Sequence, residues 1–451
     1  MANNQAKYNT YRENIGPMVY ESYSYTIDEA GMKMVFRFTI GDKITFMPTS
    51  LIERRSFLDF NQDKCTLDTL VFNIGMVELV SYWKCLCPKV VKVKPHRLDA
   101  TQTTFWKKLY YNGLGEFFYV NGINTSQDDF MLIENNDEAP FAAKFHKDLT
   151  ESYLVPIGGG KDSVVTLEVL RNLGVVPLIM NPRGATTLCA ERGGFDGVDT
   201  VLIRRCIDPT LLDLNKKGCL NGHTPFSAML AFYTLLTAVL SGRRNVALSN
   251  EGSANESTVK GSNVNHQYSK SLEFENDFRR YVSNYITGDV NYFSFLRPLS
   301  ELQIAMLFAQ HEKYFDVFKS CNAGSKEDKW CGQCAKCLFA YIILSPFINP
   351  SRLNSIFGKS MLDDPELRGY FEQLTGHTES KPFECVGTIS EVNTALAMAK
   401  TRWYSNGQLP ALLKGFDYTG EMVRLDTFDN EHNLSKVEEE QLKNSIADVL
   451  S

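Results

Sequence analysis

The chain has 451 residues, 43% of them hydrophobic and 22% charged, with a net charge of -6. That length exceeds one hydrophobic core and indicates roughly two or three domains. The slight acidic balance argues against a protein that grips nucleic acid over its whole surface. Residues 1–16 have no apolar core and predict no signal peptide, so we expect a cytoplasmic protein with no nucleic-acid or membrane partner.

The first part of the chain has the pattern of an α+β domain. Residues 19–48 largely alternate apolar and polar side chains, which predicts an antiparallel meander with turns at Gly31 and Gly41. Apolar residues at helical spacing predict helices within 67–86 and 105–119. We expect an N-terminal domain over residues 1–150, with a linker at its acidic end, 134–138. Nothing in this domain indicates catalysis by itself: it would cover the nucleotide domain or hold part of a large substrate, or it would be chiefly a folding partner.

After residue 150, short apolar strands alternate with helices. The predicted strands span 154–157, 175–180, 198–203 and 245–249, and the predicted helices span 163–173, 188–192 and 225–240. This alternation is typical of βαβ units, so we expect an α/β fold with a parallel sheet in a domain over residues 151–345. Residues 225–241 carry no charge, but their number favours a buried helix over a membrane span.

Ligands of parallel sheets gather at the carboxyl ends of the strands. The loops that leave those ends are 158–163, 181–183, 204–205 and 249–256. The last is dense in small and acidic residues, so Asn250 and Glu251 are candidates for nucleotide or magnesium contact, although a solvated polar loop has the same composition. Arg204 and Arg205 are candidates for phosphate or carboxylate pairing, or are surface arginines.

The first of these loops is the most informative. It consists of Gly158, Gly159, Gly160, Lys161, Asp162 and Ser163. Glycines on a strand-to-helix turn allow backbone N–H groups to close on an anion, and the helix N-terminus adds partial positive charge. The spacing matches neither the Walker pattern nor the dinucleotide fingerprint, so the sequence predicts a phosphate cradle of another kind, or else an ordinary glycine-rich turn.

Further along, His266 and Lys270 precede an amphipathic helix that runs through Tyr285. His266 is a candidate proton carrier, although a lone histidine is more often structural. Lys270 is a candidate partner for phosphate or carboxylate. Another helix is expected after Ser300, which suits an N-cap.

Four cysteines then follow with nine, two and two residues between them: Cys321, Cys331, Cys334 and Cys337. Four thiolates at this spacing can close around one tetrahedral zinc and leave no open position, which predicts a structural site. An iron–sulfur cluster also takes four thiolates, and unliganded buried thiols are the third alternative.

The last part of the chain, residues 346–451, is predicted to be mainly helical, with helices within 352–357, 366–374, 390–400 and 437–450. A compact non-helical stretch, Lys381 to Gly387, interrupts them and places Glu384 beside the isolated Cys385. Cysteine is often only a small buried hydrophobe, but a thiol beside a carboxyl group is also a candidate acid–base pair.

These motifs resemble known families. The glycine loop resembles the Ser-Gly-Gly-x-Asp-Ser loop of the PP-loop ATP pyrophosphatases, which split ATP into AMP and pyrophosphate, with Gly158 where that family usually has serine. The loop followed by the cysteine run, over residues 153–345, is similar to the 7-cyano-7-deazaguanine synthases, which have a zinc site of nearly the same spacing.

Most of the chain resembles the UDP-N-acetylmuramoyl-L-alanyl-L-glutamate epimerases of bacterial peptidoglycan synthesis. The resemblance rests on the N-terminal domain, the glycine loop, and residues 221–225, 249–251, 253–255 and 381–387. It implies that the terminal L-Glu of UDP-MurNAc-L-Ala-L-Glu becomes D-Glu with consumption of ATP, and that magnesium is required. An acyl-adenylate would form on the way, with release of AMP and pyrophosphate.

The resemblance also implies roles for single residues. Pyrophosphate would lie in the Gly158–Ser163 loop, with a hydroxyl from Ser163 and positive charge from Lys161. Asp162 or Glu251 would hold magnesium. Cys385 would be the first candidate for proton transfer, with Glu384 or His266 as its partner. The sequence carries no signal for the oligomeric state.

Two other functions fit parts of this pattern. The first is another ATP-dependent PP-loop enzyme, either of the deazaguanine synthase type or a tRNA-modifying enzyme, although the additional N- and C-terminal regions favour the epimerase. The second is a nucleotide-binding regulatory module without catalysis. Gly158 in place of serine supports the regulatory module, whereas Asp162 and Ser163 argue against it.

Overall fold

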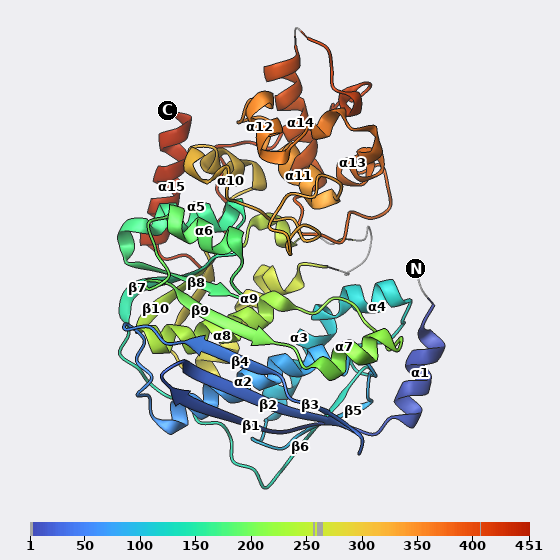
Figure 1. The fold of residues 1–451 in the computed structure, drawn as a ribbon, viewed down its shortest axis with the longest axis vertical. Helices are drawn as coiled ribbons and strands as arrows, with labels where there is room; N and C mark the ends of the chain where they lie inside the picture. The colour runs from blue at the N-terminus through green and yellow to red at the C-terminus, as the bar shows by residue number, and fades with distance from the viewer. Residues whose placement is uncertain (1–2, 256–257, 259–264, 406) are drawn as a thin grey trace. The chain divides into compact units, whose positions relative to one another are not determined.

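The structure is a computed structural model that describes residues 3–255, 258, 265–405 and 407–451 (Figure 1). The chain is α/β: eleven described strands belong to one mixed sheet, and the same residues form fifteen α-helices. It divides into two compact units that do not follow chain order. Unit 1 comprises 1–154, 201–246 and 267–292, and unit 2 comprises 155–200, 247–266 and 293–451.

Unit 1 contains the antiparallel meander that the alternating pattern predicts. Strand β1 pairs with β2 from Met18↔Ile40 to Asp28↔Gly31, and β2 pairs in turn with β3 and β4. The far side of β1 pairs in parallel with β5, and β5 with β6. The strands are β1 (Met18–Asp28), β2 (Gly31–Ile40), β3 (Ile44–Phe46), β4 (Thr49–Glu53), β5 (Val90–Val93), β6 (Leu132–Asn135) and β9 (Val201–Cys206).

Two differences from the prediction concern this sheet. Strand β4 pairs with β9 in antiparallel fashion, from Thr49↔Cys206 to Ile52↔Ile203, so the sheet is mixed where we expected it to be parallel. The βαβ pattern could not reveal this, because the added strand comes from a distant part of the chain. Glu134, expected in a linker, pairs with Lys92 inside β6.

The helices of unit 1 supply most of its buried apolar surface. Helix α2 is buried along nearly its whole length, packs against α8, β1 and β2, and is capped by Asp63. No helix among the described residues combines the length and apolarity needed to cross a membrane. The uncharged α8 is buried along most of its length. The helices are α1 (Gln5–Asn14), α2 (Lys64–Trp83), α3 (Ala100–Gly113), α4 (Gly115–Asn121), α7 (Pro209–Lys216), α8 (Phe226–Ser241) and α9 (Leu272–Tyr285).

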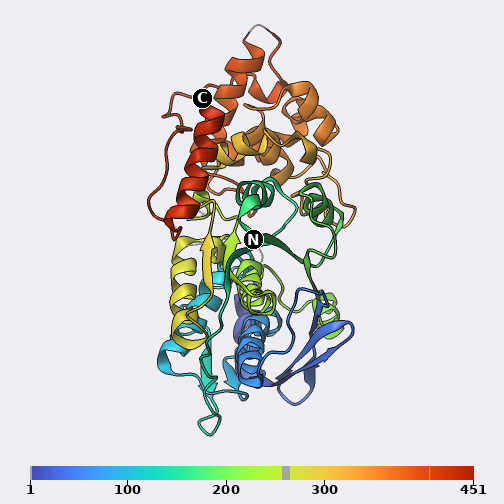
Figure 2. The ribbon, with the colours of Figure 1, turned by 90° about the vertical axis from the view of Figure 1, so that its left-hand side faces the viewer.

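Unit 2 carries the glycine loop, the cysteines and the C-terminal helices. Its last helix, α15, packs against α5 and α10 and is drawn in red in Figure 2. Ser300 caps α10 through a capping box, as the sequence predicts. The helices are α5 (Lys161–Leu170), α6 (Gly184–Arg192), α10 (Glu301–Phe308), α11 (Ala335–Leu344), α12 (Pro350–Phe357), α13 (Arg368–Thr375), α14 (Ile389–Tyr404) and α15 (Lys436–Leu450).

The remaining strands are those expected after residue 150, with one addition. Strand β8 (Val175–Met180) matches the predicted range, and β7 (Thr150–Pro156) and β10 (Arg243–Leu248) pair in parallel. The sequence did not reveal β11 (Asn291–Ser294), which is only four residues long. The division into three domains at residues 150 and 345 remains a prediction.

Candidate active site

The glycine loop lies where the sequence places it, between β7 and α5. Gly160 is the N-cap of α5, has extended backbone, and supplies no side chain to cap the helix. The first N–H groups of a helix have no partner within the helix, and together with the helix dipole they favour an anion. The N-terminus of α5 therefore has the chemistry of a phosphate cradle.

The three glycines of the loop differ in what they require. Gly159 has φ of +82°, and a Cβ there would lie 3.0 Å from Ala185, so this position needs glycine. A Cβ on Gly158 would meet no atom within 4 Å. The backbone position therefore has room for the Cβ of the serine that is usual there in PP-loop enzymes.

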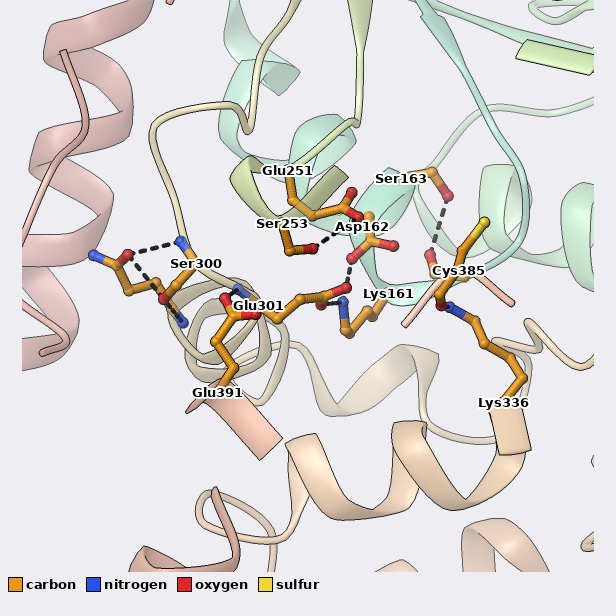
Figure 3. A network of polar contacts seen from close by, with 12 residues as sticks. Lys161, Asp162, Ser163, Glu251, Ser253, Ser300, Glu301, Lys336, Cys385 and Glu391 are labelled. Carbon is orange, nitrogen blue, oxygen red and sulfur yellow. Dashed lines mark hydrogen bonds and ion pairs between the residues drawn. The ribbon is translucent and has the colours of Figure 1, made fainter. Parts of the chain in front are cut away.

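Lys161, the first residue of α5, is buried and lies between two carboxylates. Its Nζ donates to Asp162 and to Glu301, the first residue of α10 (Figure 3). Glu391 approaches from α14, where its Oε1 accepts from the backbone N of Glu301 at 2.7 Å. We call Asp162, Glu251, Glu301 and Glu391 the carboxylate cluster.

The electrostatics of the carboxylate cluster are governed by the Lys161 ammonium, which pairs with both Asp162 and Glu301. Burial opposes the charge of Lys161, but Asp162 and Glu301 outweigh it and raise the lysine pKa, so Lys161 stays protonated. Burial raises the pKa of Glu301 to about 8, and Asp162 and Glu251 add to the rise against the opposing charge of Lys161. The cluster therefore holds a proton near neutral pH that an incoming cation could replace.

Glu251 and Asn250 follow β10, as expected for residues at the carboxyl end of a strand. Arg297, only 1% exposed, donates from Nη1 to the Glu251 backbone O at 2.7 Å. Asn250 donates from Nδ2 to Ser294 Oγ at 3.0 Å, and Ser253 donates to the Glu251 carboxylate at 3.3 Å. These bonds anchor Asn250 and Glu251 to Ser294 and Arg297. Glu256, at its far end, lies outside the described residues.

Arg183 contacts the glycine loop and was not among our predicted site residues. Its Nη2 donates to Gly158 O at 3.3 Å, and its Nη1 is buried without a hydrogen-bond partner. A buried guanidinium N–H beside an anion cradle is suited to a phosphate oxygen. Its loop, 181–183, follows β8 and was among the loops expected to face a ligand, but we had assigned Arg183 itself no role.

Glu301 was also missed, and no local signal could have revealed it. The sequence shows only an acidic residue after the Ser300 cap, which is a common surface position. Its contact with Lys161 joins residues 140 positions apart in the chain.

The four predicted cysteines come together. All four Sγ atoms lie within 4.8 Å of one another, with Cys321 to Cys334 at 3.8 Å and Cys331 to Cys337 at 3.7 Å. Thiolates bound at ~2.3 Å around a tetrahedral zinc are separated by about 3.8 Å. The arrangement therefore fits a metal held by four sulfurs, and we call these residues the cysteine cluster.

The proposed proton carriers also lie in unit 2. Glu384 accepts from Asn322 Nδ2 at 2.6 Å, and burial raises its pKa against the charges of Lys336 and His266. The charge of His266 therefore reaches the Glu384 carboxyl group and lowers its pKa. The backbone N of His266 donates to Thr258 Oγ1 at 3.1 Å. Cys385 is half-buried, and its backbone O accepts from Lys336 Nζ (Figure 3).

Arg204 and Arg205, which we considered as phosphate ligands, pair with carboxylates inside unit 1. Arg204 contacts Glu53 at 2.5 Å, and Arg205 forms two bonds to the buried Glu78 at 2.5 and 2.7 Å. The pattern of residues after a strand could not distinguish such internal pairs from ligand contacts.

These features define an α/β protein with a glycine loop at a helix N-terminus, a buried lysine–carboxylate cluster and four cysteines arranged so that they could hold a metal. Family models described as the MurL N-terminal domain and the MurL C-terminal domain match residues 9–295 and 317–419. The chain belongs to the MurL family.

Several relatives carry the name UDP-N-acetyl-alpha-D-muramoyl-L-alanyl-L-glutamate epimerase. The protein of that name from Xanthomonas oryzae pv. oryzae is 38% identical over 339 residues, which cover 73% of this chain and 74% of the relative. The protein of the same name from Micromonospora sp. is 37% identical over 342 residues, which cover 74% of this chain and 75% of the relative. The protein of the same name from Salinispora tropica is 36% identical over 340 residues, which cover 74% of this chain and 73% of the relative.

Proposed function

We propose that this protein is an ATP-dependent epimerase that converts the terminal L-Glu of UDP-MurNAc-L-Ala-L-Glu to D-Glu during peptidoglycan precursor synthesis in the cytoplasm. The observation that carries the proposal is the uncapped N-terminus of α5 with Lys161 buried between Asp162 and Glu301, in a chain of the MurL family. In this proposal residues 151–345 form a PP-loop domain, and ATP binds at its glycine loop.

The chemistry explains why an epimerase would consume ATP. The α proton of a glutamate is hard to remove because the adjacent carboxylate already carries negative charge. Attack of that carboxylate on the α-phosphate of ATP forms an acyl-adenylate and releases pyrophosphate. The uncharged acyl group stabilises the enolate that forms when the α proton leaves. Reprotonation on the opposite face and hydrolysis by water then yield D-Glu and AMP.

The residues of the loop would bind the departing pyrophosphate. The backbone of Gly158–Ser163 would surround it, and Lys161 and Arg183 would supply positive charge. The Ser163 hydroxyl, which donates to Gly160 O at 3.0 Å, would turn to donate to the phosphate instead. Asp162 and Glu251 would hold magnesium, with Glu301 as a further oxygen ligand. Bound there, magnesium would neutralise phosphate charge.

Proton transfer is assigned to the Lys381–Gly387 segment. Cys385 is the first candidate, because a half-buried thiol can both accept and donate a proton. Glu384, with its raised pKa, holds a proton more firmly than an exposed carboxyl group and suits the role of its acid partner. His266 acts on Glu384 and is the third candidate. We assign zinc to the cysteine cluster as a structural ion.

The proposal is tested by incubation of the protein with UDP-MurNAc-L-Ala-L-Glu, ATP and magnesium. We expect D-Glu by chiral analysis of the product, together with AMP and pyrophosphate. In deuterated water the α position should acquire deuterium. A folded protein that forms no D-Glu would contradict the epimerase, and D-Glu formed without ATP would contradict the acyl-adenylate.

A further inference from the structure

The segment Lys381–Gly387 has no helix or strand of its own. Its backbone begins with a bond from Lys381 N to Thr258 O at 3.1 Å, and Lys381 Nζ donates back to Gly387 O at 3.3 Å. A stretch without regular structure depends on neighbouring elements for a fixed conformation. The contacts of its central residues therefore determine where Glu384 and Cys385 are held.

Those contacts come from the chain around the cysteine cluster. Lys336 lies between Cys334 and Cys337 in the first turn of α11, and its Nζ donates to the Cys385 carbonyl (Figure 3). Asn322 follows Cys321 directly, and its Nδ2 donates to Glu384 Oε2 at 2.6 Å. Two consecutive residues of the segment are thus held by neighbours of three of the four thiols.

The other end of the segment packs on the carboxylate cluster. A Cβ on Gly387 would lie 2.8 Å from Glu391 Oε2 and 3.1 Å from Glu301 Cγ, so the backbone fits tightly against both. The Glu301 carboxyl group accepts a hydrogen bond from Lys161 Nζ of the glycine loop. The segment therefore runs from the cysteine cluster to the residues that contact the anion cradle.

Asn322 and Lys336 lie on different segments, and a metal bound by the four thiols would fix the position of one segment relative to the other. Asn322 belongs to the loop after Cys321, whereas Lys336 belongs to α11. The loop also has apolar support, because the Trp330 ring lies 5.3 Å from that of Phe318 and 4.6 Å from that of Phe357. Loss of one holding contact should therefore leave the surrounding structure folded.

We infer that the metal-bound cysteine cluster is the platform that positions Glu384 and Cys385 for proton transfer, with Lys336 and Asn322 as its positioning residues. This inference rests on the proposed function. It separates two tasks within unit 2: the glycine loop serves adenylation, and the cysteine cluster serves the proton-transfer step. A displacement of about 1 Å in a reacting group can lower a rate by about 10²-fold.

The test compares Lys336→Met with Lys329→Met. Both lysines lie between the first and last cysteines of the cluster, but Lys329 is exposed and pairs with the neighbouring, exposed Glu327 instead of the Lys381–Gly387 segment. Lys336→Arg tests rescue by a side chain that keeps the charge, and Asn322→Ala removes the second contact. Adenylation is measured as substrate-dependent exchange of labelled pyrophosphate into ATP, and proton transfer as deuterium uptake at the α carbon.

We expect Lys336→Met to lower α-deuterium uptake by about 10²-fold while pyrophosphate exchange stays within about threefold of wild type. Lys336→Arg should recover part of the loss, and Lys329→Met should match wild type in both reactions. Equal behaviour of Lys336→Met and Lys329→Met would overturn the inference, as would parallel losses of both reactions in Lys336→Met.

A measurement without substrate separates this inference from the proposed function. Amide hydrogen exchange of the peptide that covers residues 381–387 should become faster in Lys336→Met, and in wild-type protein stripped of metal, but not in Lys329→Met. Elemental analysis verifies the metal content of each sample. An inactive wild-type protein would contradict the proposed function, whereas unchanged hydrogen exchange in Lys336→Met would contradict the platform.

Discussion

Each unit contains a buried ion pair, and the two pairs differ in how their charges are matched. In unit 1, Arg205 meets Glu78 through two bonds, at 2.5 and 2.7 Å, so one guanidinium serves one carboxylate. Tyr233 Oη donates to the same carboxylate at 3.1 Å, and Ser81 Oγ accepts from Arg205 Nη2 at 3.4 Å. The charge of Glu78 is therefore matched by a protein side chain, and neighbouring hydroxyl groups provide further hydrogen bonds to the pair.

In unit 2, Lys161 is shared by Asp162 and Glu301, and the negative charge of Glu251 acts on Glu301. One ammonium cannot neutralise three carboxylates, which is why burial can raise the pKa of Glu301. The comparison teaches that burial and short contacts do not mark a functional site. What distinguishes the pair in unit 2 is its charge imbalance beside an uncapped helix N-terminus, an arrangement that suits a ligand ion.

The largest expected effect on stability comes from a change in the matched pair. Glu78→Gln leaves Arg205 buried without a counter-charge, and we expect a loss of about 3–5 kcal/mol in unfolding free energy, measured by urea denaturation. Glu53→Gln is the control, because it removes the charge that Arg204 and Arg55 share near the surface and should cost at most ~1 kcal/mol. Equal losses in the two variants would contradict the buried role of Glu78.

A change in the unmatched cluster should act on catalysis. Lys161→Met removes the ammonium from the anion cradle, and we expect kcat/KM for epimerisation to fall by about 10²–10³-fold, with pyrophosphate exchange lowered in parallel. Lys313→Met is the control, since Lys313 pairs with Glu168 in the same unit, away from the cradle, and should leave both rates unchanged. Normal pyrophosphate exchange in Lys161→Met would exclude the lysine from adenylation.

The difference between the two pairs also explains what the sequence could predict. The glycine loop and the cysteine cluster were found because their chemistry requires residues close together in the chain. Local patterns likewise predicted the meander of residues 19–48, the helices of the C-terminal region and the Ser300 cap.

Contacts between distant segments could not be predicted in this way. Glu301 and Glu78 each reach their partner across more than a hundred residues, and nothing in their local sequence separates them from surface glutamates. For the same reason Arg205 was a candidate ligand although it forms an internal pair. The antiparallel β4–β9 pairing is another long-range contact, and it makes the sheet mixed.

The smallest expected effect tests the charge imbalance itself through pH. The groups that act on Glu301 are Lys161 and Asp162 from α5, Glu251, and Lys336 from α11, and its pKa in the folded protein is about 8. Between the ordinary value of 4.5 and about 8, the folded protein keeps a proton that the unfolded chain has released, so stability falls as pH rises through this window.

Glu301→Gln removes this titration, and its melting temperature relative to wild type should therefore rise between pH 5 and pH 9. The amide also loses the ion pair with Lys161, so we expect a net gain of only about 2–4 °C at pH 9, in calorimetry without magnesium or ATP. The exposed Glu312 provides the control variant, Glu312→Gln, which should show no such trend. A difference that stays constant from pH 5 to pH 9 would mean that Glu301 is ionised throughout and that Lys161 neutralises it as fully as Arg205 neutralises Glu78.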